Sequence, residues 1–197
     1  MMRNPIMVGD RVYLRPLEES DAELLAQYAA QEPEPFWEHR MPLSPIAFTS
    51  WIREAYAKQP PEHIAFAVCL KENDQFIGTV DLWSIDWVNR TAETGSYIGH
   101  AEFRGKGYGP EAKHLLLEYA FDRIQLHMVY SMVWEPNFRS AAAVRRQGYR
   151  DAGRIKTMTR KDGRFRDWLI LDLLRDEWLA AREEYRRRIA ERAQREG

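Results

Sequence analysis

Apolar and polar residues alternate in several short runs of this 197-residue chain, and a period of two is typical of β-strands. Other runs carry apolar residues three and four positions apart, which indicates amphipathic helices. Alternating or β-branched runs predict strands over residues 11–15, 63–70, 76–86, 90–100, 127–134, 149–160 and 164–173. Helical spacing predicts helices over residues 20–28, 45–58, 110–124 and 137–147. This order of elements describes a mixed α/β sheet.

Short motifs mark where these elements begin and end. Ser20-Asp-Ala-Glu23 has the form of a capping box that opens the first helix. Pro110 is predicted to be the first residue of the third helix, because its missing N–H group costs nothing there. Gly148 is expected to end the fourth helix in a left-handed cap, and Asp162-Gly163 to turn the last hairpin. The proline- and aromatic-rich residues 33–42 predict a long loop that either covers an acceptor site or packs on its own side chains.

The stretch from Phe103 to Gly109 reads Phe-Arg-Gly-Lys-Gly-Tyr-Gly and lies between a predicted strand and a predicted helix. Its three glycines allow positive φ and close approach of a ligand to the backbone. The helix start adds free N–H groups and positive potential, and Arg104 and Lys106 add charge. We therefore expect a phosphate or diphosphate ligand, with a plain tight turn as the alternative. The glycine spacing differs from that of the P-loop and of the dinucleotide fingerprint, so an NAD- or nucleotide-binding protein is the weakest interpretation.

Composition narrows the function classes. A net charge of −1 gives no electrostatic case for binding nucleic acid or an anionic membrane. The single cysteine, Cys69, lies in an apolar strand and is expected to be a buried thiol in a reducing compartment. No apolar run has the length of a membrane span, so we expect a soluble, cytoplasmic protein. His114 has no second histidine or thiol at ligand spacing, so we expect a solvent-facing residue and no metal site.

From Asp176 onward the chain becomes rich in arginine and glutamate, and few large apolar residues remain. Acids and bases nearly balance, which predicts a solvated helix held by i,i+4 ion pairs. This helix is expected to dock on the rest of the chain or on a second subunit. A nucleic-acid-binding arm is disfavoured because the glutamates cancel the arginines.

Three motifs in order carry a resemblance to a known family. Arg104-Gly-x-Gly-x-Gly109 resembles the coenzyme A loop of the GNAT superfamily of N-acetyltransferases. Asn137-Phe-Arg-Ser140 followed by Gly148-Tyr149 is similar to the family's Asn-x-x-Ser … Gly-Phe segment. Residues 161–171 resemble the closing hairpin of the ribosomal-protein (RimJ/RimL-type) branch, and with Val12–Pro16 the likeness spans about residues 10–178.

This resemblance implies a fold and a division of the chain. The fold is a GNAT-like domain whose central, twisted, mostly antiparallel sheet of about six to seven strands is flanked by about four helices. Residues 1–178 would form the acyl-CoA-dependent N-acetyltransferase domain, and residues 179–197 a charged helical extension. A homodimer is a family-level expectation.

The resemblance also implies an activity. Acetyl-CoA would be the co-substrate, without a metal, and the acceptor a primary amine such as a peptide N-terminus, a polyamine or an amino sugar. The loop would bind the diphosphate, and residues 97–99 would hold the pantetheine arm and thioester. Transferred onto this chain, the family's coenzyme A contacts fall on Tyr97, Ile98, Gly99, Arg104, Gly105, Lys106, Gly107, Tyr108, Gly109, Asn137 and Ser140.

The acid–base residues are less clearly marked. A protonated amine must lose a proton before it attacks a thioester, so a general base is expected. The tyrosine that many family members use as an acid is replaced by Val144, while Ser140 matches the serine of the ribosomal-protein branch. That branch's glutamate base aligns with Thr159, which cannot act as a base. Glu93 and Asp81 remain as candidate bases, with an ordinary solvated or ion-paired strand carboxylate as the alternative for each.

Two other interpretations follow from these departures. The same fold can use another acyl-CoA, such as succinyl-CoA, whose carboxylate would suit Arg139, Arg160 or Arg164. The chain can also be a coenzyme A-binding sensor or interaction module without turnover. The missing tyrosine and the lack of a clear base suggest this interpretation.

Overall fold

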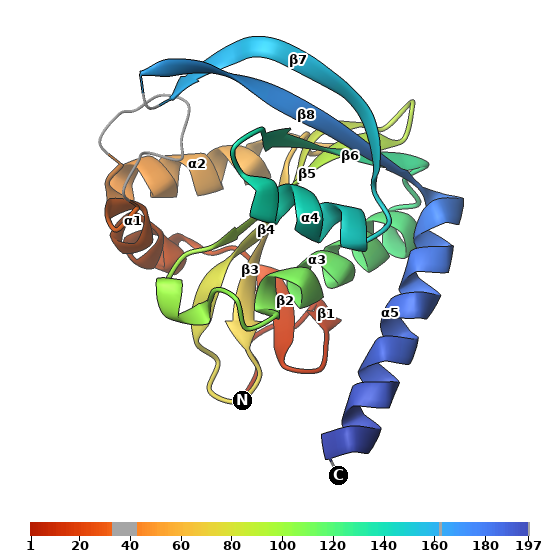
Figure 1. Cartoon of the computed structure of the whole chain (residues 1–197). Coiled ribbons are helices and arrows are strands. Elements are labelled where there is room, and N and C mark those ends of the chain that lie inside the picture. Colours follow the sequence, from red (N-terminus) through yellow and green to blue (C-terminus); the bar gives the residue numbers. More distant parts are fainter. Residues whose placement is uncertain (33–42, 162, 197) are drawn as a thin grey trace. The chain divides into compact units, whose positions relative to one another are not determined.

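The computed structural model describes residues 1–32, 43–161 and 163–196 (Figure 1). The predicted loop over residues 33–42 and Asp162 of the predicted last turn lie outside them. The described residues contain eight strands and five α-helices. They form two compact units, one made of residues 1–85 and 95–119 and the other of residues 86–94 and the chain from residue 120 onward.

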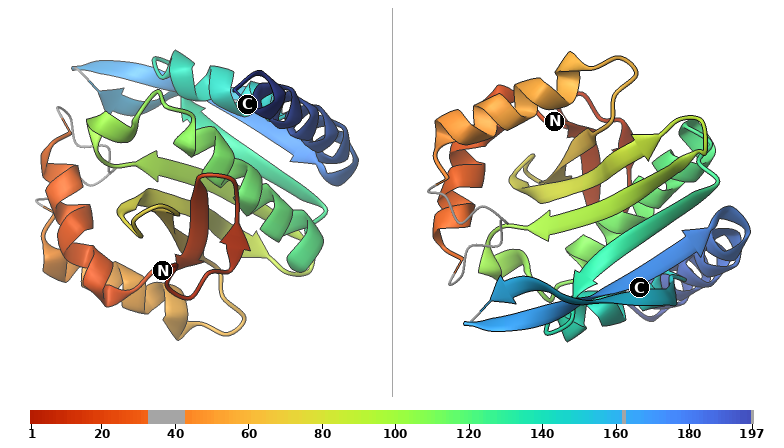
Figure 2. Two further views of the ribbon diagram at one scale, coloured as in Figure 1. Left: turned by 90° about the horizontal axis from the view of Figure 1, so that it is seen from below. Right: turned by 90° about the horizontal axis from the view of Figure 1, so that it is seen from above.

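The first unit is a sheet covered by three helices. Its strands occur in the order β1 (Met7–Val8), β2 (Val12–Pro16), β3 (Ile64–Leu70), β4 (Phe76–Asp86) and the second half of β5 (Thr91–Ile98). The pairs from β1 to β4 are antiparallel. Its helices are α1 (Ala22–Ala30), α2 (Pro45–Ala57) and α3 (Tyr108–Glu118), and Figure 2 shows them from two further sides.

Alternation along the strands divides the core of this unit between two faces. Tyr13, Ala67 and Cys69 point to the face where the apolar side chains of α1 and α2 are buried. On the opposite face the ring of Phe66 meets Tyr119 edge-on at the end of α3, with centroids 4.8 Å apart. The prediction of a buried strand thiol is confirmed, and burial raises the pKa of Cys69.

The second unit contains the remaining strands and helices. Its strands occur in the order β5 (first half), β6 (Met128–Trp134), β8 (Arg164–Leu174) and β7 (Arg150–Lys161). β5 runs parallel to β6, and the other pairs are antiparallel. Its α-helices are α4 (Phe138–Arg146) and α5 (Arg175–Glu196).

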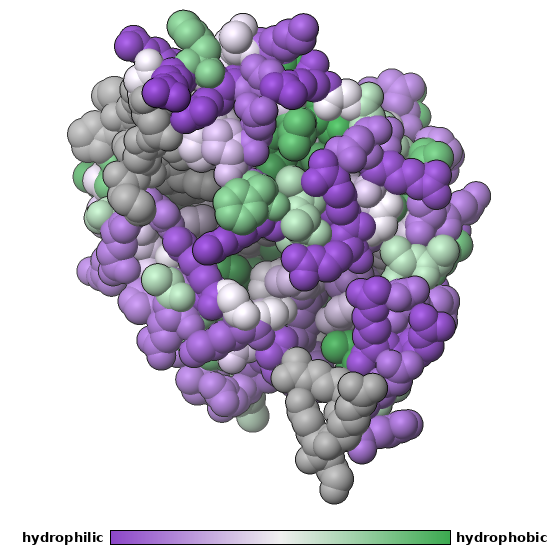
Figure 3. Space-filling model, viewed as in Figure 1, coloured by the Kyte–Doolittle hydropathy of each residue, from purple (hydrophilic) through white to green (hydrophobic). Residues whose placement is uncertain are grey.

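An aromatic contact helps to fix the charged C-terminal helix. The buried indole of Trp178 stacks on Phe121 with centroids 5.0 Å apart, and the guanidinium of Arg182 lies over the same indole. The outer surface of α5 is hydrophilic, as predicted (Figure 3). The predicted domain boundary after residue 178 falls inside α5 and stays a prediction. Among the described residues, no helix combines the length and the apolar character needed to cross a membrane.

Most predicted elements are present, and the expected mixed α/β, mostly antiparallel sheet is confirmed. The number of strands is eight rather than six to seven, because β1 is only two residues long and too short to show a period. Gly148 has φ +101°, as a positive-φ helix end requires, and Gly163 has φ +68°.

The predicted capping box at Ser20 is wrong. A short 3-10 helix (Glu19–Asp21) precedes α1, and the carboxylate of Asp21 accepts a hydrogen bond from the Glu18 N–H at 2.9 Å. Asp21 is held in turn by the buried guanidinium of Arg15 at 2.6 and 2.8 Å. The ion pair with Arg15 therefore holds Asp21 in the capping position. The Ser20–Glu23 motif alone does not reveal this ion pair.

The predicted start of the third helix is also wrong. α3 begins at Tyr108, so Pro110 is its third residue, and Gly107 with φ +87° is the N-cap. The α-helical part ends at Glu118 and continues as a π-helix (Tyr119–Arg123). Proline is still tolerated, because every position of the first turn lacks an intrahelical N–H partner.

His114 is buried rather than solvent-facing. Only 9% of its surface is exposed, because α3 is enclosed at this position. Burial disfavours the protonated ring and lowers the pKa of His114 from 6.5 to about 4.

This shift predicts a pH dependence of stability. The unfolded chain takes up the His114 proton near pH 6.5 and the folded chain only near pH 4, so stability is full above pH 6.5 and is lost as pH falls towards 4. We expect His114→Gln to remove a slope of up to about 1.4 kcal/mol per pH unit between pH 6.5 and 5. Urea unfolding at several pH values measures this slope. His127→Gln, which changes an exposed histidine, should keep it, and an unchanged slope in His114→Gln would contradict the assignment.

Candidate functional site

The glycine-rich turn of the first unit has the shape of an anion cradle. Gly105 and Gly107 have φ angles of +76° and +87°, a backbone region that residues other than glycine rarely adopt. A Cβ atom built on Gly105 would meet no atom within 4 Å, so this side of the turn is open. The turn leads directly into α3, whose first N–H groups point out of the helix start. The loop therefore fits a diphosphate group.

A cation that the sequence did not reveal lies beside this turn. Arg11 comes from the start of β2 and donates through Nη1 to the carbonyl of Lys106 at 2.9 Å. Its guanidinium also lies over the Tyr108 ring, 4.9 Å from the centroid. The two residues joined by the hydrogen bond are 95 positions apart, and no local motif points to such a contact. Arg11 therefore supports the loop, and its guanidinium is also paired with the Glu111 carboxylate at 3.2 Å.

Arg104 has a different position from the one its place in the motif suggested. Its Nε and Nη2 atoms donate to the carbonyls of Ile98 and Gly99 at 2.8 and 2.7 Å. It also forms an ion pair with Glu32, whose carboxylate accepts the Tyr97 hydroxyl at 3.1 Å. Burial, followed by the Glu32 charge, raises the pKa of Tyr97. In this structure Arg104 thus fixes the end of β5, and Arg11 is the cation that contacts the loop backbone.

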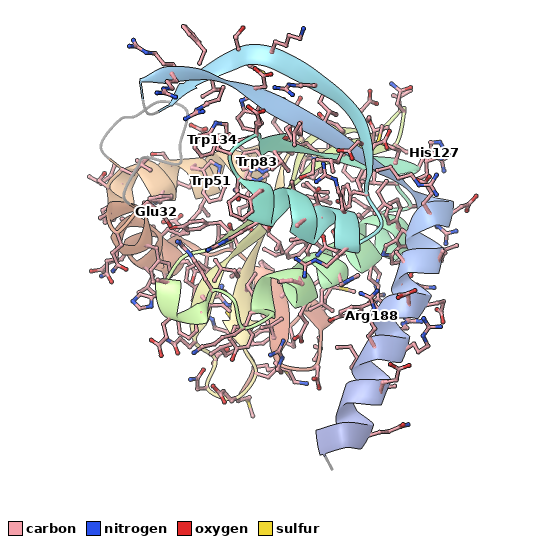
Figure 4. All side chains as sticks on the ribbon, in the orientation of Figure 1. Glu32, Trp51, Trp83, His127, Trp134 and Arg188 are labelled. Carbon is pink, nitrogen blue, oxygen red and sulfur yellow. The ribbon has the colours of Figure 1, made fainter. Side chains whose placement is uncertain are left out.

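The candidate base Asp81 lies in the same unit and has close partners. Its Oδ1 atom lies 3.3 Å from Nε2 of His63, and its Oδ2 atom accepts the Thr79 hydroxyl at 3.1 Å. The His63 ring stacks on the indole of Trp83, with centroids 3.6 Å apart and planes at 11°. Trp51 of α2 lies beside both rings, and Figure 4 labels the two tryptophans. Sequence reasoning named Asp81 but missed His63, which precedes β3 and carries no local signal.

The other predicted site residues belong to the second unit. Asn137 is the N-cap of α4, and its Oδ1 atom accepts the Ser140 N–H at 3.2 Å. The predicted capping role is confirmed, and contact with coenzyme A stays a prediction. Glu93 stands opposite Tyr130 in the parallel β5–β6 register; burial, and after it the Glu93 charge, raise the pKa of Tyr130. Glu93 and Asp81 thus belong to different units.

Comparison with known proteins identifies the family. The profile of the acetyltransferase (GNAT) domain matches residues 11–150. The chain belongs to the GNAT acetyltransferases. It is an acetyl-CoA-dependent N-acetyltransferase, as the resemblance of its sequence motifs implied.

Individual relatives agree with this family. The putative ribosomal N-acetyltransferase YdaF of Bacillus subtilis is 28% identical over 87% of this chain and 95% of its own. A solved structure of a probable acetyltransferase is 27% identical with a TM-score of 0.76, covering 86% of this chain and 96% of its own. A chimera of the spermidine N-acetyltransferase SpeG from Vibrio cholerae and hSSAT has a TM-score of 0.77 at 21% identity, covering 86% and 99%.

Two positions of this GNAT acetyltransferase depart from the family's acid–base pattern. Val144 is buried in α4 where many members have a tyrosine. Thr159 accepts a hydrogen bond from Nε1 of Trp168 at 2.7 Å and carries no carboxylate. Arg139 is one of the arginines expected to suit the carboxylate of a succinyl group. Its guanidinium lies over the exposed Phe138 ring, 5.9 Å from the centroid. Within the described residues, no three His, Cys, Asp or Glu side chains gather as a metal site.

Proposed function

We propose that this acetyltransferase binds acetyl-CoA with the diphosphate on residues 104–109 and transfers its acetyl group to a primary amine. The single observation that carries the proposal is the loop itself. Two open, positive-φ glycines precede α3, and the Arg11 guanidinium lies against the loop backbone. Backbone N–H groups and cations converging on one helix start are suited to a diphosphate.

The residues of β5 would position the acyl group. Tyr97, Ile98 and Gly99 lie directly before the loop, and Arg104 holds the carbonyls of the last two in place. Backbone donors at this strand end would stabilise the oxyanion that forms when the amine attacks. The new N–C bond forms as the C–S bond breaks, and the proton lost by nitrogen balances the one gained by the thiolate. Asn137 and Ser140 would contact the thiol end of coenzyme A.

The acceptor class is proposed from chemistry and from the names of relatives. A polyamine or a peptide N-terminus presents the primary amine that direct transfer needs. Spermidine appears in the name of one structural relative, and a ribosomal substrate in the name of one curated relative. The departures at Val144 and Thr159 weaken the ribosomal-protein assignment more than they weaken acetyl transfer.

Calorimetric titration with acetyl-CoA, succinyl-CoA, free coenzyme A and NAD tests the binding step. Release of free thiol with spermidine, N-terminal peptides and amino sugars then tests transfer. Tight acetyl-CoA binding with thiol release supports the proposal. Preference for succinyl-CoA would show that the transferred group is succinyl rather than acetyl. Binding of a coenzyme A species without thiol release for any amine would favour a sensor. Failure to bind any coenzyme A species would overturn the loop assignment.

Ser140→Ala is expected to lower kcat about 10-fold and leave the dissociation constant of acetyl-CoA nearly unchanged. The α4 cap uses the backbone N–H of Ser140 and not its hydroxyl, so folding should be little affected. Steady-state kinetics with circular dichroism measures both, and Ser20→Ala, at an exposed serine, is the control. A wild-type rate in Ser140→Ala would remove this hydroxyl from the chemistry.

A further inference from the structure

The carboxylate of Asp81 is fixed in a way that an ordinary strand carboxylate is not. One oxygen faces Nε2 of His63 and the other accepts the hydroxyl of Thr79. The exposed fractions of the two side chains are 7% for Asp81 and 12% for His63. A nearly buried carboxylate that holds one imidazole nitrogen selects the tautomer with hydrogen on Nε2 and leaves the lone pair on Nδ1.

Aromatic rings complete the surroundings of this imidazole. Trp83 covers one face of the ring, and Trp51 lies 5.3 Å from His63 and 5.8 Å from Trp83 between centroids. Trp51 belongs to α2 and Trp83 to β4, and Figure 4 labels both side chains. Aromatic faces and a carboxylate together stabilise a positive charge, whether it is on the imidazole or on an ammonium group placed beside it.

The strand register puts this cluster next to the predicted thioester site. A Cβ atom on Gly95 of β5 would lie 3.1 Å from Nε1 of Trp83 and 3.7 Å from Cβ of Asp81. The missing side chain at Gly95 therefore makes room for the cluster. Tyr97 follows two residues later on the same face, roughly 7 Å along the strand. That is where the proposed function places the acyl group.

We propose that His63, held by Asp81, accepts the proton of the acceptor amine, and that Trp51 and Trp83 are the aromatic walls of its site. This role rests on the proposed function. A proton passes from the ammonium nitrogen to Nδ1 of His63, and the freed lone pair forms the C–N bond. The C–S bond breaks and its electron pair leaves on the thiolate. The resulting amide nitrogen gives its second proton to the thiolate, and His63 releases the first to water.

Among the described residues, the side chains in contact with His63 come from β4 and α2. β4 contributes the Asp81 carboxylate together with Thr79 and Trp83, and α2 contributes Trp51. On its own segment, the neighbouring Glu62 is paired with Lys58 at 2.6 Å in an exposed position. Asp81 is thus the charged group that the described residues place in contact with the ring.

The experiment is the pH profile of kcat/KM for acetylation of spermidine, or of whichever amine the screen identifies. His63→Gln is expected to lower kcat/KM at least 10-fold at neutral pH and to move the acid limb of the profile to higher pH, with acetyl-CoA affinity unchanged. Asp81→Asn keeps the imidazole but removes its carboxylate partner, so it should lower kcat/KM by a smaller factor. His127→Gln changes an exposed histidine of the other unit and should keep the wild-type profile.

Chemical rescue separates a chemical role from a structural one. Added imidazole should restore part of the rate of His63→Ala, because the vacated site can admit the free base. A wild-type profile in His63→Gln, or loss of activity in a folded His63→Ala variant that imidazole does not restore, would overturn the role of His63. If the wild type releases thiol while either of these results is found, only the role of His63 is overturned and the proposed acetyl transfer is retained. Absence of thiol release by the wild type with every amine would overturn both.

Discussion

Replacing Gly105 by glutamate is expected to weaken acetyl-CoA binding at least about 100-fold and to leave the protein folded. Gly105 has φ +76° and open space around it, so the new side chain meets no protein atom and projects from the turn. Its carboxylate would stand beside the proposed diphosphate, and a like charge in such a position costs several kcal/mol of binding free energy. Isothermal titration with acetyl-CoA measures the loss.

The chain offers a matched control for this change. Gly163, in the turn between β7 and β8, has φ +68° and also has no atom within 4 Å of a Cβ position. Gly163→Glu therefore carries the same backbone strain, about 1 to 2 kcal/mol of stability, without a charge in the coenzyme A loop. Both variants should lose similar stability in urea, and only Gly105→Glu should lose affinity. Equal affinities for acetyl-CoA would show that residues 104–109 do not hold the diphosphate.

Gly107 is a less informative position for the same test. A Cβ atom there would lie 3.0 Å from Nη2 of Arg11, so a new carboxylate could pair with that guanidinium instead of repelling the ligand. The sequence alone gave equal grounds for choosing either glycine. The structure separates them because the neighbour of Gly107 comes from a distant part of the chain.

Features that depend on local geometry could be predicted from the sequence. The capping role of Asn137 follows from the residues next to it, and the structure shows the hydrogen bond. The glycine-rich turn was located for the same reason, since positive φ at Gly105 and Gly107 is a property of the backbone there. Strand positions followed from alternation, because one-residue slips would bury polar groups.

Features that depend on tertiary contacts could not be predicted. His114 was expected to face solvent because a helix usually buries one stripe, but seven consecutive residues of α3, from Glu111 to Leu117, are buried. Polar residues of α3, such as Lys113 and His114, are buried together with the apolar ones, so polar positions in this sequence do not mark an exposed face. Arg11 and His63 were missed because their partners lie far along the chain. The pairing of the Arg104 guanidinium with Glu32 was not predicted for the same reason.

Glu111→Ala is the substitution that should cost most in stability, about 3 kcal/mol. The Oε1 atom of Glu111 accepts the N–H groups of Arg11 and Val12 at 2.7 and 3.1 Å, and Oε2 accepts Nε of Arg11 at 3.2 Å. The side chain is only 5% exposed, so truncation leaves a buried backbone donor without an acceptor. Water does not replace the lost hydrogen bond at such a buried position. Glu111→Gln keeps one acceptor oxygen and should lose less.

The same change should reach the ligand site through Arg11. Once released by Glu111, Arg11 no longer fixes the Lys106 carbonyl, so we expect acetyl-CoA affinity to fall about 10-fold in Glu111→Ala. Glu23→Ala is the matched control, because Glu23 also lies in the first turn of a helix but is exposed, and its loss should cost only about 0.3 to 1 kcal/mol. Urea unfolding and calorimetric titration measure both effects. Lost stability with unchanged affinity would show that the loop keeps its shape without the Glu111–Arg11 pair. A stability like that of Glu23→Ala would show that the buried carboxylate does not hold β2 to α3.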